Sequence, residues 1–144
     1  MARAIATCSP TNSSRHTWAI PDVSEIEIED HDGRILEVKI PVTFSTFGPP
    51  YTELLTRVPD TVWDVCGLHH VGYWCDDVIG ETARLMADGW ALDTRGTPDE
   101  NGEVRFSYLS HPALGRIELV NRNIEADICT WVAGGEFRLN EPRP

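Results

Sequence analysis

Residues 66–122 constrain the fold most, because they follow the pattern of a strand, a helix and three further strands. The segment opens with Gly-Leu-His-His-Val-Gly-Tyr-Trp-Cys-Asp-Asp at residues 67–77 and closes with Gly-Arg-Ile-Glu-Leu-Val at residues 115–120. This order predicts that a histidine near the first strand and a glutamate on the last strand reach one concave face of a sheet. Such a pair suits a divalent metal ion and a small acidic substrate.

Apolar runs and turn residues give the limits of these elements. Residues 68–74 have the composition of a buried strand, and Asp76 or Asp77 is a suitable N-cap for the helix that follows. The helix is expected to run to about Asp88, with Gly89 as its C-terminal stop. Three strands follow, of which the first starts at residues 90–92 and the others cover residues 103–109 and 116–120.

Residues 17–65 contain mainly strand patterns. Glutamates alternate with isoleucines over residues 23–30, which predicts a half-exposed strand. A turn leads into a second, antiparallel strand with apolar side chains on one face between residues 36 and 44. Pro41 inside this strand implies an edge position or a bulge. A short strand over residues 51–55 follows a break rich in glycine and proline.

The two halves of the chain share short stretches of sequence, which predicts an internal repeat. Residues 17–20 (Thr-Trp-Ala-Ile) match residues 89–92 (Gly-Trp-Ala-Leu), and residues 51–55 (Tyr-Thr-Glu-Leu-Leu) match residues 116–120 (Arg-Ile-Glu-Leu-Val). The glutamates at the centres of the two five-residue stretches correspond in this alignment. The first half has no equivalent of the strand and helix that open the second half.

The repeat divides the chain into four parts. Residues 1–16 are expected to be a flexible N-terminal arm. Residues 17–65 form a truncated first module made mainly of strands, and residues 66–122 form a complete module. Residues 123–144 form a C-terminal tail with one helical turn around residues 124–131. A chain of 144 residues fits one domain of this kind, or two small half-domains that share a core.

Charge and cysteine content exclude several classes of protein. The net charge of -11, with scattered basic residues, argues against a nucleic-acid surface. The chain has no run of about 18 apolar residues, so a membrane span is not expected. It also has no apolar stretch of signal-peptide type at the N-terminus. The cysteines form no close pair (Cys8, Cys66, Cys75 and Cys129). We therefore expect a cytoplasmic protein with reduced thiols.

Residues 69–122 resemble the vicinal oxygen chelate superfamily, which includes glyoxalases, methylmalonyl-CoA epimerases, extradiol dioxygenases and bleomycin-resistance proteins. The resemblance lies in residues 70–77 (His-Val-Gly-Tyr-Trp-Cys-Asp-Asp), in the helix before Gly89, and in residues 117–120 (Ile-Glu-Leu-Val). It implies an α+β fold in which two paired βαβββ modules form a curved mixed sheet around one metal ion. The first module of this chain then lacks its opening strand and helix.

The resemblance also implies the metal ligands. His70 matches the ligand on the family's first strand, Glu118 matches the ligand on the last strand, and Glu53 is its counterpart in the first half. One imidazole and two carboxylates suit a divalent metal ion such as Zn, Ni, Co, Fe, Mn or Mg. The family's other first-strand ligand has no clear equivalent. The site therefore has three protein ligands plus waters, or is completed by a second chain, or has lost its metal.

Catalytic and substrate-contacting residues follow from the same pattern. Either Glu118 or Glu53 could be the base that moves a proton at a carbon next to the substrate oxygens. Partial burial would raise the pKa of the carboxylate and suit it to that role. Four further side chains are candidates for lining the substrate pocket: Tyr73, Phe106, Tyr108 and His111.

The resulting functional prediction is a metal-dependent isomerase, epimerase or lyase that acts on a small oxygenated substrate chelated by a divalent metal ion. One alternative is a ring-cleaving dioxygenase, although such enzymes usually use two histidines and one carboxylate. Another alternative is a metal-free ligand-binding or resistance protein of the same fold. A sheet that is short of one strand has an open edge, so a homodimer is also expected.

Overall fold

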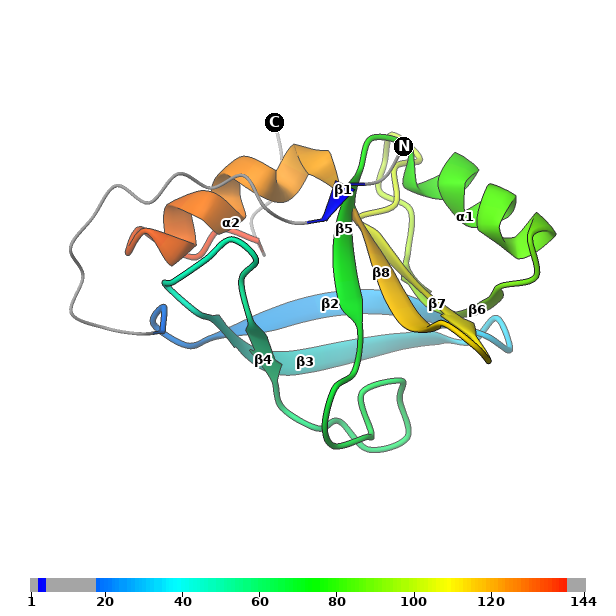
Figure 1. Ribbon diagram of the computed structural model, residues 1–144, viewed down its shortest axis with the longest axis horizontal. Helices are drawn as coiled ribbons and strands as arrows, with labels where there is room; N and C mark the ends of the chain where they lie inside the picture. The colour runs from blue at the N-terminus through cyan, green and yellow to red at the C-terminus, as the bar shows by residue number, and fades with distance from the viewer. Residues whose placement is uncertain (1–2, 5–17, 140–144) are drawn as a thin grey trace.

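The computed structural model describes residues 3–4 and 18–139 of the chain. In this part eight strands form one curled mixed sheet with helices packed against it, so the expected α+β class and curved mixed sheet are confirmed (Figure 1). The strands are β1 (Arg3–Ala4), β2 (Asp22–Asp30), β3 (Ile35–Phe44), β4 (Glu53–Leu55), β5 (Val71–Cys75), β6 (Ala91–Gly96), β7 (Phe106–His111) and β8 (Gly115–Asn121). The helices are α1 (Val78–Ala87), the 3-10 helix η1 (Arg122–Ile124) and α2 (Glu125–Val132). Among these described helices, none is long and apolar enough to cross a membrane.

The strand order separates the sheet into two groups of neighbours. The order is β1-β5-β8-β7-β6-β2-β3-β4. β5 and β8 are parallel, and the other neighbouring strands are antiparallel. β2 and β6 pair only between residues 28–30 and residues 94–96. The strands of the second half are therefore joined to those of the first half by a short stretch of pairing.

The two faces of the curled sheet are covered by different elements. Side chains alternate between the faces along each strand, so Tyr108 and its cross-strand partner Glu118 lie on one face, which we call the inner face. Trp63, in the connection between β4 and β5, packs on the inner face. α2 closes one end of the inner face, and α1 covers the outer face (Figure 1).

α1 follows β5 where the sequence predicts it. Its N-cap Asp77 accepts a hydrogen bond from the Gly80 N–H at 2.8 Å, which satisfies one of the free donors of the first turn. Gly89, directly after the helix, has a φ of +93°, a conformation that glycine adopts without steric cost. The buried side chains of the helix are Val78, Thr82 and Leu85.

Pro41 occupies an edge position of the sheet. It lies opposite Val23, and the register between β2 and β3 is unbroken. The Pro41 carbonyl accepts a hydrogen bond from the Thr56 N–H at 3.0 Å, just beyond the end of β4. In an antiparallel strand, the N–H and C=O groups of one residue point toward the same neighbouring strand. The position where Pro41 lacks an N–H therefore faces the side of β4, which has already ended there, so no strand hydrogen bond is lost. Of the two predicted explanations, the edge is correct and the bulge is not.

Two expectations about the ends of the chain need correction. Arg3–Ala4 forms β1 and pairs with β5, so the predicted flexible arm includes a strand, while residues 1–2 and 5–16 of that arm lie outside the described residues. The predicted tail holds more than one helical turn, because η1 is followed directly by α2. The longer helix buries its apolar side chains in the end of the inner face. Residues 140–144 of the tail lie outside the described residues.

The cysteines also differ from expectation. Cys129 on α2 is disulfide-bonded, so the prediction that all four cysteines are reduced is wrong. Cys66 is free and exposed, and Cys75 is free and buried. Sequence spacing does not show which cysteines meet in space, and this is why the prediction failed.

A buried hydrogen bond between α1 and β7 gives a test of this packing. Thr82 Oγ1 and Ser107 Oγ are 2.6 Å apart, and both residues are buried. Thr82→Val leaves the Ser107 hydroxyl without its partner, so we expect the free energy of unfolding in urea to fall by about 1–3 kcal/mol. The double variant Thr82→Val/Ser107→Ala should lose less than the sum of the two single variants. Strictly additive losses would show that this hydrogen bond does not couple the helix to the sheet.

Candidate metal centre

Three segments bring Glu53, His70 and Glu118 together on the inner face. Glu118 lies in the middle of β8, and its partners in the register of the sheet are Gly72 of β5 and Tyr108 of β7. Glu53 is the first residue of β4, and His70 directly precedes β5.

The side chains of these three residues are in direct contact. His70 Nε2 lies 3.3 Å from Glu53 Oε2 and 3.2 Å from Glu118 Oε2. The exposed fraction of each side chain is small, at 9% for His70, 21% for Glu53 and 15% for Glu118. One donor atom from each residue lies within 4.8 Å of the others. The structure thus brings together the three residues that the sequence analysis grouped, and we call them the His–Glu–Glu cluster.

The ionisable groups of the cluster act strongly on one another. Burial alone would lower the pKa of His70, but the hydrogen bonds to Glu118 and Glu53 and the charges of these two residues outweigh burial and raise that pKa to about 10. Burial raises the pKa of Glu53; the hydrogen bond to His70 opposes this rise, and the charge of Glu118 adds to it. In the metal-free protein at neutral pH, His70 therefore carries a proton that lies between two carboxyl groups.

The spacing and charge of the donor atoms fit a divalent metal ion. An ion about 2.1 Å from each donor, with tetrahedral or octahedral bond angles, places neighbouring donors roughly 3.0–3.4 Å apart. Both distances from His70 Nε2 to the carboxylates lie in this range. With the glutamates ionised, a proton on His70 leaves the cluster with one net negative charge. A divalent ion bound to neutral His70 would bring that charge to zero.

Aromatic side chains form the wall of the cluster. The ring centroid of Tyr108 lies 4.9 Å from that of His70, and the Trp63 ring packs edge-on against Tyr108 at 5.6 Å. Burial, followed by the charges of Glu118 and Glu53, raises the pKa of Tyr108 well above its ordinary value, so its hydroxyl stays protonated. The buried Nε1 of Trp63 has no hydrogen-bond partner among the described residues.

Sequence reasoning missed Trp63 because it lies in a connection without strand or helix periodicity. The signal that could have found it is its residue type: a tryptophan in a polar connection is expected to be buried against a neighbouring surface. Here that surface is the inner face.

His69, which directly precedes His70 in the sequence, is a second neighbour of the cluster. Its Nδ1 lies 2.8 Å from Nδ1 of His70, and its Nε2 lies 2.8 Å from the Val62 carbonyl oxygen and 2.8 Å from Arg116 Nη1. Arg116 Nε also forms an ion pair with Asp93 Oδ2 at 2.7 Å. Burial lowers the pKa of His69, and the charges of His70 and Arg116 lower it further, so the ring is neutral.

The predicted pocket residues lie in different places. Tyr108 is part of the wall of the cluster. Tyr73 pairs with Leu119 in the register of the sheet, and it therefore lies on the outer face. His111 ends β7, where its ring packs against that of Trp90 at 5.3 Å. The structure does not bring Tyr73 or His111 to the cluster.

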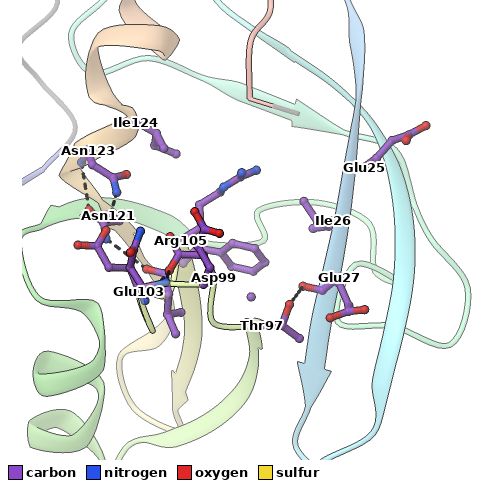
Figure 2. A pocket seen from close by; sticks show the side chains of 15 residues that line it. Glu25, Ile26, Glu27, Thr97, Asp99, Glu103, Arg105, Asn121, Asn123 and Ile124 are labelled. Atoms are coloured by element: carbon purple, nitrogen blue, oxygen red, sulfur yellow. Dashed lines mark hydrogen bonds between the residues drawn. The ribbon is translucent and has the colours of Figure 1, made fainter. Parts of the chain in front are cut away.

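A cavity of about 430 Å³ lies between β2, the connection from β6 to β7, and η1 (Figure 2). Phe106, the remaining predicted pocket residue, lines this cavity and also contacts the Tyr108 ring at 5.6 Å. In Figure 2 Ile26 points into the cavity from β2, and Ile124 lies on the opposite side. None of the three residues of the cluster lines this cavity, although five carboxylate residues do: Glu25, Glu27, Asp99, Glu100 and Glu103.

A second group of metal-type donors lies in the turn between β2 and β3, at Asp30, His31 and Asp32. His31 and Asp32 are exposed, and Arg34 forms ion pairs of 2.9 Å with each of the two aspartates. Because Arg34 already occupies both aspartates and two of the three donors are exposed to water, the turn is a useful control for the His–Glu–Glu cluster and is not a candidate site.

Comparison with known proteins identifies no relative. No protein-family model, curated protein or solved structure matches the chain. The geometry of the cluster and the order of the strands that carry it are therefore the basis for inferring a function.

The raised pKa of His70 predicts how pH changes the stability of the metal-free protein. The pKa is about 10 in the folded state against an ordinary value of 6.5, so protonated His70 stabilises the fold fully below about pH 6.5. This contribution is lost as pH rises to about 10, by at most about 1.4 kcal/mol per pH unit. When unfolding in urea is measured with a chelator present, the free energy of unfolding should fall more steeply with rising pH in the wild type than in His70→Gln. Equal pH slopes would contradict the prediction.

Proposed function

We propose that this protein binds a divalent metal ion through His70, Glu53 and Glu118, and that it moves a proton on a small oxygenated substrate as an isomerase, epimerase or lyase. The observation that carries the proposal is the contact of one imidazole nitrogen with two poorly exposed carboxylates. A structural ion pair needs only one carboxylate for each imidazolium. The second carboxylate adds negative charge that a divalent ion would balance.

The arrangement of the strands supports a place in the vicinal oxygen chelate superfamily. The chain order β5, α1, β6, β7, β8 has His70 just before its first strand and Glu118 on its last strand. The first half supplies β2, β3 and β4, with Glu53 on the last of these three strands. We propose that the two halves are paired βαβββ modules, of which the first is shortened at its opening.

The residues around the cluster suit proton transfer. The bound ion would polarise the substrate oxygens and reduce the cost of negative charge that develops there. Glu53 or Glu118 would act as the base, since both carboxylates are poorly exposed and lie beside the position of the ion. This base would remove the proton next to the substrate carbonyl and return it to the same or to the neighbouring carbon. The protonated hydroxyl of Tyr108 would be a donor for a substrate oxygen.

The two alternative functions have weaker support. A ring-cleaving dioxygenase usually needs two histidines and one carboxylate. The second imidazole, of His69, already has neighbours within 2.8 Å at both ring nitrogens. A metal-free binding protein does not account for the second carboxylate beside His70, whose charge a divalent ion would balance. Both alternatives rank below metal-dependent proton transfer.

Metal binding is the direct test. We expect one divalent ion per chain by titration calorimetry and elemental analysis, with affinity at least tenfold lower in His70→Ala, since one first-coordination donor is removed. About one proton should leave on binding near pH 8, because His70 with a pKa of about 10 must give up its proton. The matched control is His31→Ala, in the exposed turn, which should bind like the wild type. No binding in the wild type would contradict the proposal.

Proton transfer can be tested without knowing the natural substrate. Small 2-oxo and 2-hydroxy acids and thioesters would be incubated with the metal-loaded protein in D₂O, and hydrogen exchange at the adjacent carbon would be followed by NMR. We expect exchange with at least one compound, and its loss after chelation. Tight metal binding with no exchange in any compound of these classes would contradict the proposed reaction while leaving the metal site in place.

The open edge of β4 supports the proposed homodimer. β4 ends the strand order among the described residues, and the exposed fractions of Leu54 and Phe47 nearby are 49% and 59%. The unpaired backbone groups of this edge and the apolar side chains near it are suited to contact with a second chain. Analytical ultracentrifugation at micromolar concentration should give a dimer mass for the wild type and a shift toward monomer for Leu54→Lys. A monomeric wild type would contradict the prediction.

A further inference from the structure

The contacts of His69 constrain where the protons of both histidines lie. His69 Nδ1 and His70 Nδ1 are 2.8 Å apart, so one of these nitrogens must donate and the other accept. On the other side of the ring, His69 Nε2 lies 2.8 Å from the carbonyl oxygen of Val62 and 2.8 Å from Arg116 Nη1. The two groups near Nε2 make opposite demands on it.

The Val62 carbonyl can only accept a hydrogen bond, and the Arg116 guanidinium can only donate one. A hydrogen bond to Val62 therefore needs a proton on His69 Nε2, whereas one from Arg116 needs a lone pair there. In a neutral ring the proton position at Nε2 fixes that at Nδ1. Once His70 is neutral, as metal binding requires, the choice between Val62 and Arg116 thus decides whether His69 accepts from His70 or donates to it.

Only one of these arrangements leaves His70 ready for a metal ion. If His69 bonds to Val62, its Nδ1 has a lone pair and accepts the Nδ1–H of His70. His70 can then offer the lone pair of Nε2 toward Glu53 and Glu118. If His69 bonds to Arg116 instead, it donates to His70 Nδ1, and a neutral His70 must keep its proton on Nε2, where a metal ion would have to bind.

We propose that His69 is a positioning residue for the metal centre: bonded to the Val62 carbonyl, it accepts the Nδ1–H of His70 and directs Nε2 of His70 to the two glutamates. Metal-binding histidines generally donate their second ring N–H to such an acceptor, which fixes the tautomer and the ring orientation. Here the acceptor is the neighbouring imidazole. This inference rests on the proposed metal-binding function and assigns a role to a residue that does not touch the ion.

Arg116 competes with the Val62 carbonyl for Nε2 of His69. Its Nε is held by Asp93 at 2.7 Å, and Asp93 also accepts a hydrogen bond from the Ser110 hydroxyl at 2.8 Å. These contacts keep Nη1 within reach of His69 without making it dependent on His69. Loss of Arg116 should therefore favour the bond from His69 to Val62, and with it metal binding.

Two substitutions of His69 separate the proposed role from simple packing. His69→Asn keeps an acceptor close to the position of Nδ1, whereas His69→Phe keeps an aromatic ring and removes the acceptor. We expect Zn²⁺ affinity to fall about 10–100-fold in His69→Phe, as for the loss of other partners of metal ligands, and to be largely retained in His69→Asn. Equal loss in both variants, or no loss in either, would overturn the proposal.

Arg116 variants test the competition, and charge must be controlled. Arg116→Met should raise Zn²⁺ affinity, but removal of a nearby positive charge would do the same. Arg116→Lys keeps the charge and lacks the planar fork that reaches Asp93 and His69 together. We expect a gain in affinity in both variants. A gain in Arg116→Met alone would show that charge, and not the proton position on His69, is responsible.

Nitrogen-15 NMR of the histidine rings reads the arrangement without metal. The metal-free wild type should show a proton on His70 Nδ1 that exchanges slowly, with His69 protonated on Nε2, and the slow exchange should be lost in His69→Phe. If His69→Phe does not fold, His69→Asn and both Arg116 variants still give this readout. A wild type with this NMR pattern that binds no metal would refute the proposed function alone. A metal-binding wild type with His69 protonated on Nδ1 would refute only the role of His69.

Discussion

The contact of Glu53 and Glu118 with one imidazole is the constraint on which the shape of the sheet depends. β4 and β8 are separated by five steps in the strand order, and a flat sheet with about 4.8 Å between neighbours would hold them about 24 Å apart. Their carboxylates nevertheless reach the same nitrogen of His70. The sheet must therefore curl until its far strand faces its second and third strands. Residues on the inner face then fill the space, chiefly Trp63 against Phe106 and Tyr108.

Stability alone does not explain this cluster. Removing two carboxylates and one imidazole from water is costly, and their mutual attraction repays that cost only when charges and hydrogen bonds are balanced. Here one proton on His70 serves two carboxylates, and burial raises the pKa of Glu53. Apolar side chains of similar volume would fill the same space without that cost. A divalent ion would balance this group of charges better than one proton does.

Local patterns predicted most of the elements, the family resemblance predicted His70 and Glu118, and the repeat added Glu53. The alternation of residues 23–30, the N-cap at Asp77 and the stop at Gly89 are short-range signals, and each element formed where they indicated. Glu53 could be found only by aligning the two halves, because β4 has three residues and no periodicity of its own. Trp63, β1 and the disulfide at Cys129 depend on contacts between distant segments, and no local pattern records them. Tyr73 was misplaced because its face follows from the register with β8, which the sequence does not show.

The position of His70 before β5, and not within it, explains how two adjacent histidines can serve one site. Inside a strand, neighbouring side chains point to opposite faces, so His69 and His70 could not both reach the inner face. Ahead of Val71, where β5 begins, the chain is not held in the pleat, and both imidazoles lie against the ring of Tyr108 at 5.5 and 4.9 Å. Their rings meet at 87°, which aims one nitrogen of each at the other. Extending β5 by two residues would break this pair, so the short strand is itself a condition for the metal centre.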